Sequence, residues 1–359
     1  MENKSLSECG LLGKTGLRVS PLCLGAMTFG TEWGWGSDES TARQILSRYL
    51  DAGGNFIDTA DNYTDGHSEE IVGKFLKERG RRDRVVLATK FSFNTAPGDP
   101  NGGGNGRKHI LESINSSLKR LQTDYIDLYW LHAWDTLTPV EEVMATLDNL
   151  VHFGKVRYIG FSNTPSWYVS RAQTLAQWRG YERLCAMQME YSLVERDIER
   201  EHIPAARHLG MGICAWSPLA GGFLTGKYQR AGANVSGKGR IQTMQDQGSM
   251  LTPRFSDKDW SALRVVQEVS RDLRRSSSQV ALNWVCSQPQ VSSAIIGATD
   301  VGQLGDLLAS IEFEIPTEHR NRLDEASRLG AIYPYTFFTP EQRTSMAGGV
   351  KVREAVLAH

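Results

Sequence analysis

Gly53-Gly54-Asn55-Phe56-Ile57-Asp58-Thr59-Ala60-Asp61-Asn62-Tyr63 is the stretch that decides the fold. Its largely apolar run at 55–57 is too short for a helix and predicts a buried strand. Asp58 ends this strand, and Tyr63 follows in a polar loop. Two later apolar runs end on a polar side chain in the same way, one at Lys90 and one at His132. We therefore expect three successive strands that each present a reactive group at the carboxyl end.

The rest of the chain repeats this alternation of strand and helix. Strands are expected over 22–27, 55–58, 85–90, 125–131, 156–161, 185–190, 211–216 and 291–296. Helices are expected at about 38–51, 69–79, 109–121, 139–153, 165–178, 198–209, 257–274, 278–287 and 301–310. Mostly apolar strands are typical of a parallel sheet with both faces covered. Alternating units of this kind form either a doubly wound sheet or a closed barrel, and eight units favour an α/β fold of the (β/α)8 TIM-barrel type.

Four segments lie outside the repeat. Residues 11–19 predict an N-terminal β-hairpin, and residues 92–106, rich in Gly, Asn and Pro, predict a mobile loop. The Gly-rich insertion at 218–256 follows a strand, where barrels place their ligand-binding loops. The tail at 328–359 is expected to lie near the barrel mouth or against the side of the barrel. We expect one barrel domain over 1–359, with its core at about 16–325 and extra helices outside the barrel.

Composition narrows the class of protein. The chain has 359 residues and a net charge of −1, from 40 Lys and Arg against 41 Asp and Glu, which gives no reason to expect a nucleic-acid or membrane partner. The five cysteines form no CxxC pair, which favours free thiols in a reducing compartment. We see no apolar leader or membrane span and expect a cytoplasmic protein. Oligomeric state is left open.

The strand ends suggest proton chemistry. Every strand of a βα barrel ends at the same rim, so Asp58, Lys90 and His132 are expected in one pocket with Tyr63 above them. A lysine ammonium close to a phenol lowers its pKa from about 10, and an aspartate offsets the cost of burying the ammonium. His132 offers a donor for a carbonyl oxygen. Such a proton donor, without a nucleophile, implies a hydride from a nicotinamide cofactor.

Each member of this set also has a purely structural interpretation. Asp58 can cap a helix, Lys90 can be a solvated lysine at the end of a strand, and His132 can be a satisfied core histidine. Tyr63 alone carries almost no information. The functional hypothesis therefore depends on all four residues occurring together. A metal-dependent barrel hydrolase needs a His-x-His pair at a strand end, which this chain lacks, so no metal site is expected.

Several motifs in a fixed order resemble those of the aldo-keto reductase superfamily. They include Asp58-Thr59-Ala60-Asp61-Asn62-Tyr63, Thr89-Lys90, Gly160-Phe161-Ser162-Asn163, Gln188-Met189-Glu190-Tyr191-Ser192, Trp216-Ser217-Pro218-Leu219 and Ile296-Gly297-Ala298-Thr299. Trp at 216 resembles the branch that contains bacterial members and potassium-channel β-subunits. The resemblance implies that Tyr63 is the general acid, that Lys90 and Asp58 tune it, and that His132 orients the carbonyl.

The resemblance also implies a cofactor site. The nicotinamide carboxamide would be held by Ser162, Asn163 and Gln188, with Trp216 stacked on the ring. The pyrophosphate would be held by Ser217, Pro218, Leu219, Gly221, Gly222, Lys227 and Arg240. The last phosphate would be held by Gly297, Thr299, Gln303 and Asp306, at a helix amino terminus. Aromatic and other loop residues that could line a substrate pocket are Met27, Trp33, Trp35, Phe91 and Trp134.

Cofactor choice and function leave alternatives. Family members that prefer NADPH commonly carry Arg or Lys just after the Gly297 position, whereas this chain has Ala298, Thr299 and Asp300. Leu307 stands where relatives often have an adenine-contacting Asn. We expect NADPH, with NADH as the alternative. The expected function is reversible reduction of an aldehyde or ketone, and the alternative is a cofactor-sensing subunit with slow turnover.

Overall fold

The structure is a computed structural model that describes residues 5–232, 234–250, 252–350 and 352. Contacts along the chain divide it into one unit that ends at Ser327 and a second that begins at Arg328. The predicted core at about 16–325 falls within the first unit. The second unit contains the short helix α12 (Pro340–Met346), and the expected place of this tail stays a prediction.

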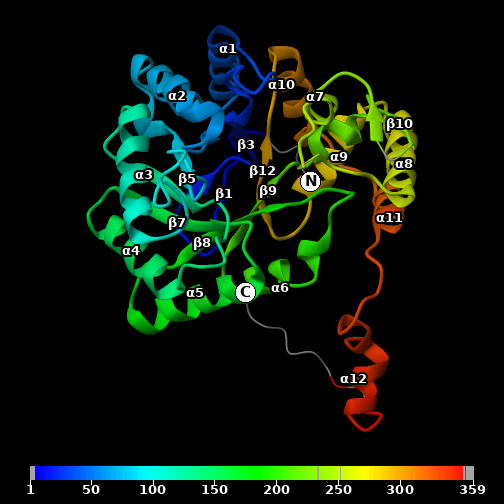
Figure 1. Ribbon diagram of the computed structural model, residues 1–359. Coiled ribbons are helices and arrows are strands. Elements are labelled where there is room, and N and C mark those ends of the chain that lie inside the picture. Colours follow the sequence, from blue (N-terminus) through cyan, green and yellow to red (C-terminus); the bar gives the residue numbers. More distant parts are fainter. Residues whose placement is uncertain (1–4, 233, 251, 351, 353–359) are drawn as a thin grey trace. The chain divides into compact units, whose positions relative to one another are not determined.

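Eight parallel strands form a closed barrel at the centre of the first unit (Figure 1). In order around the barrel they are β12 (Val291–Ile296), β3 (Leu22–Gly25), β4 (Phe56–Asp58), β5 (Val86–Phe91), β6 (Ile126–Leu131), β7 (Val156–Ser162), β8 (Leu184–Glu190) and β9 (Gly212–Trp216). Strand β12 pairs in parallel with both β3 and β9, which closes the ring. The TIM barrel predicted from the strand repeat is confirmed.

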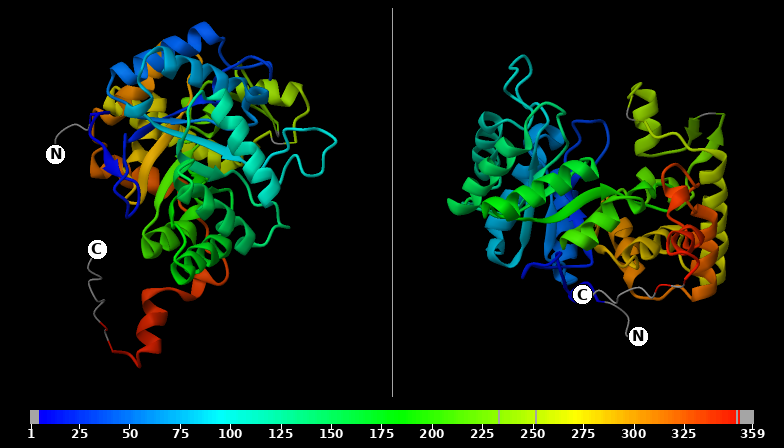
Figure 2. Two further views of the ribbon diagram at one scale, coloured as in Figure 1. Left: turned by 90° about the vertical axis from the view of Figure 1, so that its left-hand side faces the viewer. Right: turned by 90° about the horizontal axis from the view of Figure 1, so that it is seen from below.

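Helices surround this barrel (Figure 2). They are α1 (Glu39–Asp51), α2 (His67–Glu78), α3 (Arg107–Arg120), α4 (Val140–His152), α5 (Ser166–Arg179), α6 (His202–Leu209), α8 (Asp257–Leu273), α9 (Ser277–Cys286), α10 (Val301–Leu308) and α11 (Thr317–Ser327). Helix α6 begins at His202 rather than at 198, because residues 197–199 form a separate 3₁₀ turn. Helix α11 was not predicted, and its short apolar face buries only Leu323 and Ser327.

The insertion after β9 is more ordered than its composition suggests. It contains a two-stranded ribbon of β10 (Gln229–Ala231) and β11 (Asn234–Ser236), followed by α7 (Arg240–Asp246). The sequence predicted only an irregular loop there, because Gly-rich segments carry little periodic signal.

The N-terminal hairpin of β1 (Gly10–Leu11) and β2 (Arg18–Val19) is confirmed and lies at the amino ends of two barrel strands. The Lys14 N–H donates to the Gly210 carbonyl at 2.8 Å. Gly13 has φ +59, and a Cβ built on it would lie 2.4 Å from the Cys185 carbonyl oxygen, so only glycine fits this turn. The hairpin therefore covers the end of the barrel opposite to the predicted site.

Alternation along the strands fills the barrel interior. The inward-facing cluster contains Leu12, Val19, Cys23, Phe56, Val86, Ala88, Leu128, Trp130, Cys185, Ala186 and Cys214. Trp130 is fully buried, and a Cβ on Gly160 would lie 2.3 Å from its ring, so the absence of a side chain at 160 makes room for the indole. Because side chains alternate along a strand, the residues two positions after Phe56, Ala88 and Trp130 also point inward, at the carboxyl rim. These residues are Asp58, Lys90 and His132.

Asp61, which lies between β4 and α2, is a buried carboxyl group behind this rim. Its N–H donates to the Lys90 carbonyl at 3.1 Å, and its carboxyl oxygens have no hydrogen-bond partner among the described residues. Burial raises the pKa of Asp61 to about 8, and the Glu69 carboxylate acts in the same direction, while Arg120 opposes both. Arg120 is already paired with Glu69 at 2.6 Å, so it compensates Asp61 poorly.

This raised pKa predicts that the protein loses stability as pH rises. An unfolded aspartate ionises near pH 4, whereas folded Asp61 holds its proton until about pH 8. Its contribution to the free energy of unfolding is therefore complete below pH 4 and is lost as pH rises through 8. Between pH 6 and pH 9, the free energy of unfolding measured with urea should fall by about 1–3 kcal/mol more in wild type than in Asp61→Asn.

Asp83→Asn at an exposed position is the matched control and should keep the wild-type pH dependence. Identical pH dependence in wild type and Asp61→Asn would contradict the assignment of this pKa.

Candidate active site

Lys90 is the centre of the predicted catalytic group. Its ammonium is fully buried and donates to Asp58 Oδ2 at 2.5 Å, to the Thr59 carbonyl at 2.7 Å and to the Tyr63 hydroxyl at 3.0 Å. Asp58 and Tyr63 are buried as well. The three predicted residues therefore form one hydrogen-bonded cluster.

The backbone between Asp58 and Tyr63 sets the position of the phenol. The Thr59 N–H donates to the Ala88 carbonyl at 2.9 Å, which continues the pairing of β4 with β5 for one residue beyond β4. The chain then turns, with the Tyr63 N–H donating to the Ala60 carbonyl at 3.2 Å. Left-handed backbone at Thr64 and Asp65 follows and leads into α2. The turn folds Tyr63 back over the strand ends.

His132 follows β6 directly and lies beside the phenol. Its ring centroid is 5.7 Å from that of Tyr63, and the two rings meet edge to face. Burial holds the pKa of His132 well below its usual value, and the Lys90 ammonium acts in the same direction. The imidazole is therefore neutral at physiological pH and has one N–H to donate. Its Nδ1 has no hydrogen-bond partner among the described residues.

The pKa of Tyr63 differs from the simple expectation. Burial raises it above its ordinary value, while Lys90 lowers it and Asp58 raises it. The predicted lowering by Lys90 is present, but desolvation of the phenolate is larger. For Lys90, desolvation lowers the pKa, and Asp58 and Tyr63 together raise it to about 12. The lysine is thus a fixed cation at neutral pH.

The residues predicted to hold the nicotinamide come from the next three strands around the barrel. Ser162 ends β7, Gln188 lies in β8, and Trp216 ends β9. The Ser162 hydroxyl is buried without a partner in the described part of the chain, as expected of a group that waits for a ligand. Gln188 Nε2 donates to Asp58 Oδ1 at 3.0 Å, which leaves its amide oxygen free of that contact.

Asn163 is held by protein groups on both sides of its amide. Its Nδ2 donates to the His132 carbonyl at 2.9 Å, and its Oδ1 accepts from Trp216 Nε1 at 3.2 Å. Asn163 therefore links His132 to Trp216 in this structure, and contact with a carboxamide stays a prediction. The unpaired Ser162 hydroxyl and the half-buried face of Trp216 fit a planar ligand bearing an amide.

The loop after β9 presents backbone in an unusual conformation. Ser217, Ala220, Gly221 and Gly222 all have positive φ, between 49° and 92°. The N–H groups of Ala220 and Gly222 donate to the Ser217 and Leu219 carbonyls at 2.8 and 2.9 Å, and the Gly221 N–H donates to Ser217 Oγ at 3.1 Å. Contact of this turn with a pyrophosphate therefore stays a prediction. Two further predicted cofactor residues in this loop, Pro218 and Leu219, carry no feature of their own that tests their role. Lys227 is exposed.

Arg240 was predicted to hold the pyrophosphate, but in this structure its guanidinium lies over the Trp35 ring, 4.9 Å from the ring centroid. It thus joins α7 to the Trp33–Trp35 loop. Gln247 Nε2 adds a 3.1 Å hydrogen bond to the Trp33 carbonyl.

The predicted phosphate site at α10 is occupied by the helix's own cap. Asp300 is the N-cap, and its Oδ1 accepts from the Gln303 N–H at 2.8 Å. Gln303 Oε1 in turn accepts from the Thr299 N–H at 3.1 Å. Asp306 accepts from Ser276 Oγ and Gln279 Nε2, so its carboxylate serves the packing of α9 against α10. A carboxylate therefore sits at the helix amino terminus near Gly297.

The structure places the residues that were predicted to face the substrate in different surroundings. The Trp33 ring meets the Tyr63 ring edge to face, with their centroids 6.2 Å apart. The Trp33 and Trp35 rings are tilted by 47° with their centroids 5.6 Å apart, and Met27 is half-buried. Trp134 packs against Trp167 and Tyr168 of α5. Phe91 is a wrong prediction, because it is fully buried and packs on Tyr129 in the layer between barrel and helices. Since Lys90 points inward, its neighbour must point outward.

Two residues at this rim were missed. Phe93 is 45% exposed and its ring meets the His132 ring edge to face at 4.8 Å. It lies in the Gly- and Asn-rich loop, whose composition conceals it. Glu190 ends β8 beside Trp216. Burial raises the pKa of Glu190 to about 7, Glu195 acts in the same direction, and Arg240 opposes them. Its inward position, two residues after Gln188, was the available signal.

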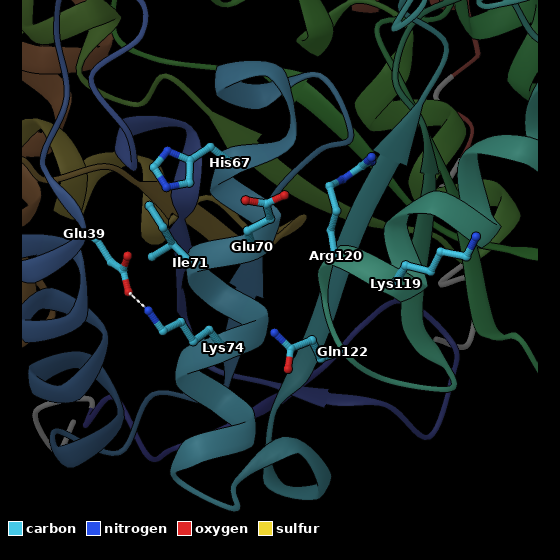
Figure 3. A pocket seen from close by; sticks show the side chains of 8 residues that line it. All are labelled: Glu39, His67, Glu70, Ile71, Lys74, Lys119, Arg120 and Gln122. Carbon is cyan, nitrogen blue, oxygen red and sulfur yellow. Dashed lines mark hydrogen bonds and ion pairs between the residues drawn. The ribbon is translucent and has the colours of Figure 1, made fainter.

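A separate pocket lies on the outer face between α1, α2 and α3 (Figure 3). It is lined by Glu39, His67, Glu70, Ile71, Lys74, Lys119, Arg120 and Gln122. Lys74 crosses it to pair with Glu39 at 2.7 Å. None of the predicted site residues lines it, so the chemistry is assigned to the barrel rim. In the described part of the chain, no helix is long and apolar enough to cross a membrane, and no three or more His, Cys, Asp or Glu side chains form a group suited to a metal ion.

Comparison with known proteins gives matches along most of the chain. The model of the aldo/keto reductase family matches residues 21–328. The uncharacterized oxidoreductase YrpG of Bacillus subtilis (strain 168) is 40% identical over 328 residues, which cover 89% of this chain and 95% of that protein. The aryl-alcohol dehydrogenase [NADP(+)] of Phanerodontia chrysosporium is 33% identical over a match that covers 90% of this chain and 86% of that protein.

The norsolorinic acid reductase of Aspergillus flavus is also 33% identical, over a match that covers 94% of this chain and 86% of that protein. The matches span the whole barrel, including every strand that carries a predicted catalytic residue. The chain belongs to the aldo/keto reductase family.

Proposed function

We propose that the protein is an NADPH-dependent enzyme that reversibly reduces an aldehyde or ketone to an alcohol. The observation that carries the proposal is the buried contact of Lys90 with Asp58 and Tyr63 beside a neutral His132. Relatives whose names state an activity include an aryl-alcohol dehydrogenase [NADP(+)] and a norsolorinic acid reductase, which supports oxidoreductase chemistry between a carbonyl and an alcohol.

The roles of the four side chains follow from their contacts. The Tyr63 hydroxyl donates its proton to the carbonyl oxygen, and the phenolate left behind is stabilised by the Lys90 ammonium 3.0 Å away. Asp58 offsets the cost of keeping that ammonium buried. The neutral imidazole of His132 donates a hydrogen bond to the same carbonyl oxygen and orients it. The nicotinamide, when bound, supplies the hydride to the carbonyl carbon.

The residues that would hold the cofactor lie on one side of this group. Ser162 and Gln188 would bind the carboxamide, Trp216 would cover one face of the ring, and the loop at 217–222 would lie along the pyrophosphate. The NADP dependence named for one relative supports NADPH. The carboxylate of Asp300 opposes it, because a 2′-phosphate at α10 would meet a negative charge.

Tyr63→Phe tests the proton donor. Removing the hydroxyl should lower kcat for carbonyl reduction by about 10²–10⁴-fold, the usual contribution of general acid catalysis. Cofactor affinity, measured by titration of protein fluorescence, should stay within about twofold. Undiminished turnover in this variant would refute the assigned role. Wild type that oxidises bound NADPH once but shows no multiple turnover would instead support a cofactor-sensing subunit.

Trp216→Ala tests the stacking surface. Loss of an aromatic face against the nicotinamide should raise the dissociation constant for NADPH about tenfold. Trp178→Ala is the matched control, since this indole is 76% exposed on α5 and is not part of the site. Equal titration curves for wild type and Trp216→Ala would show that the indole only packs.

Asp300→Asn tests the phosphate site without removing the helix cap. Asparagine caps a helix as well as aspartate does, so the fold of α10 should be kept while one negative charge is lost. We expect affinity for NADPH to rise roughly three- to tenfold and affinity for NADH to stay unchanged. The same change with both cofactors would mean that no 2′-phosphate binds beside this helix.

A further inference from the structure

Ser92 directly follows β5 and has a strained backbone. Its φ is 128°, in the region that favours glycine. A serine held there costs on the order of 1–3 kcal/mol, so the surrounding contacts must determine its conformation. Its hydroxyl accepts from the His132 N–H at 3.1 Å and from the Ala133 N–H at 3.4 Å. Its carbonyl accepts from the Gly104 N–H at 2.7 Å.

Asn105 completes this arrangement from the other end of the loop. The side chain is fully buried, its Oδ1 accepts from the Ser92 hydroxyl at 2.7 Å, and its Nδ2 donates to the Ala133 carbonyl at 2.9 Å. Its own N–H donates to Asp135 Oδ2 at 2.8 Å. The two ends of the loop, which projects from the barrel in Figure 2, are thus tied to each other and to the segment after β6.

The hydrogen bonds that join the two ends of this loop determine where Phe93 lies. The residue follows Ser92 directly, so the positive φ at Ser92 sets the direction in which the ring leaves the strand. The ring ends edge-on against His132 and remains 45% exposed at the rim. Trp33 meets Tyr63, the other member of the reactive pair, edge to face at 6.2 Å. Two aromatic side chains therefore contact the two groups that are assigned to the carbonyl oxygen.

We propose that Phe93 is a specificity-determining residue, that Ser92 and Asn105 are positioning residues for it, and that the site selects flat aromatic aldehydes and ketones over saturated ones of equal size. The inference rests on the proposed function. A flat ring whose carbonyl reaches Tyr63 and His132 approaches the aromatic side chains that contact these two residues, Trp33 and Phe93. Aromatic pairs are favoured beyond the area they bury. A puckered saturated ring of the same carbon number gains the burial but not the aromatic contact.

Phe93→Ala should reduce this discrimination. Benzaldehyde and cyclohexanecarbaldehyde have the same carbon number and differ in the flat π system. The ratio of their kcat/KM values should exceed one in wild type and fall about three- to tenfold in Phe93→Ala. The control Phe153→Ala removes a phenyl group that is 78% exposed at the end of α4 and should keep the wild-type ratio. An unchanged ratio in Phe93→Ala overturns the proposal.

Ser92→Ala tests the positioning role. Losing the hydroxyl removes the hydrogen bond to Asn105 and the two from the segment after β6. We expect KM for benzaldehyde to rise more than KM for cyclohexanecarbaldehyde. The value of kcat is calculated per cofactor-binding site, and the number of these sites is measured by titration. A purely structural role would lower the fraction of active sites and leave the KM ratio at its wild-type value, and that result overturns the positioning role.

A binding measurement separates this inference from the proposed function. Benzamide and cyclohexanecarboxamide are unreactive analogues whose dissociation constants can be measured by calorimetry with NADP⁺ present. Tighter binding of benzamide to wild type, lost in Phe93→Ala, supports the aromatic site even if no carbonyl is turned over and the proposed function fails. Equal binding of both amides overturns the inference, whether or not the protein is a reductase.

Discussion

The buried ammonium of Lys90 is the constraint on which the site depends. Burying an isolated charge costs several kcal/mol even after relaxation, so each of its N–H groups needs a partner. A lysine ammonium has three donors, and here they are used by Asp58, the Thr59 carbonyl and the Tyr63 hydroxyl. The phenol oxygen is therefore fixed as the third partner. Asp58 extends the network, because its second oxygen accepts from Gln188 and so reaches the side of the barrel assigned to the cofactor.

This network modifies the usual account of how a lysine tunes a tyrosine. The ammonium does favour the phenolate, yet the same burial that makes Lys90 effective also penalises the phenolate, and the pKa of Tyr63 ends above its ordinary value. A tyrosine that keeps its proton until a polar carbonyl group arrives fits the role of donor better than that of base. The low pKa of His132 has a related consequence, since a neutral imidazole adds no second cation beside Lys90.

The sequence predicts the barrel, and it also predicts that four side chains come together at the barrel rim, because both features depend on local rules. Strand ends can be read from apolar runs, and alternation then assigns the inward side chains. The same alternation shows why Phe91 was a wrong prediction, since it follows an inward residue directly. What could not be predicted depends on contacts between distant segments. Asp300 as a helix cap, Arg240 on Trp35 and Phe93 on His132 are all settled by tertiary packing, and Gly-rich composition conceals the order of α7.

Backbone strain marks the rim independently of side-chain chemistry. Among the described residues, the non-glycine positions with positive φ are Thr64, Asp65, Ser92, Gln122, Thr136, Asn163, Ser217, Ala220 and Arg274. Gln122 and Arg274 lie at helix carboxyl ends, where a left-handed residue is an ordinary way to stop a helix. All the others follow the carboxyl ends of barrel strands β4 to β7 and β9. Each costs on the order of 1 kcal/mol, which is a noticeable part of a total stability of about 5–15 kcal/mol. The packed barrel beneath offsets that cost, and the strained residues Thr64, Ser92 and Ser217 are the sequence neighbours of Tyr63, Phe93 and Trp216 at the carboxyl rim of the barrel.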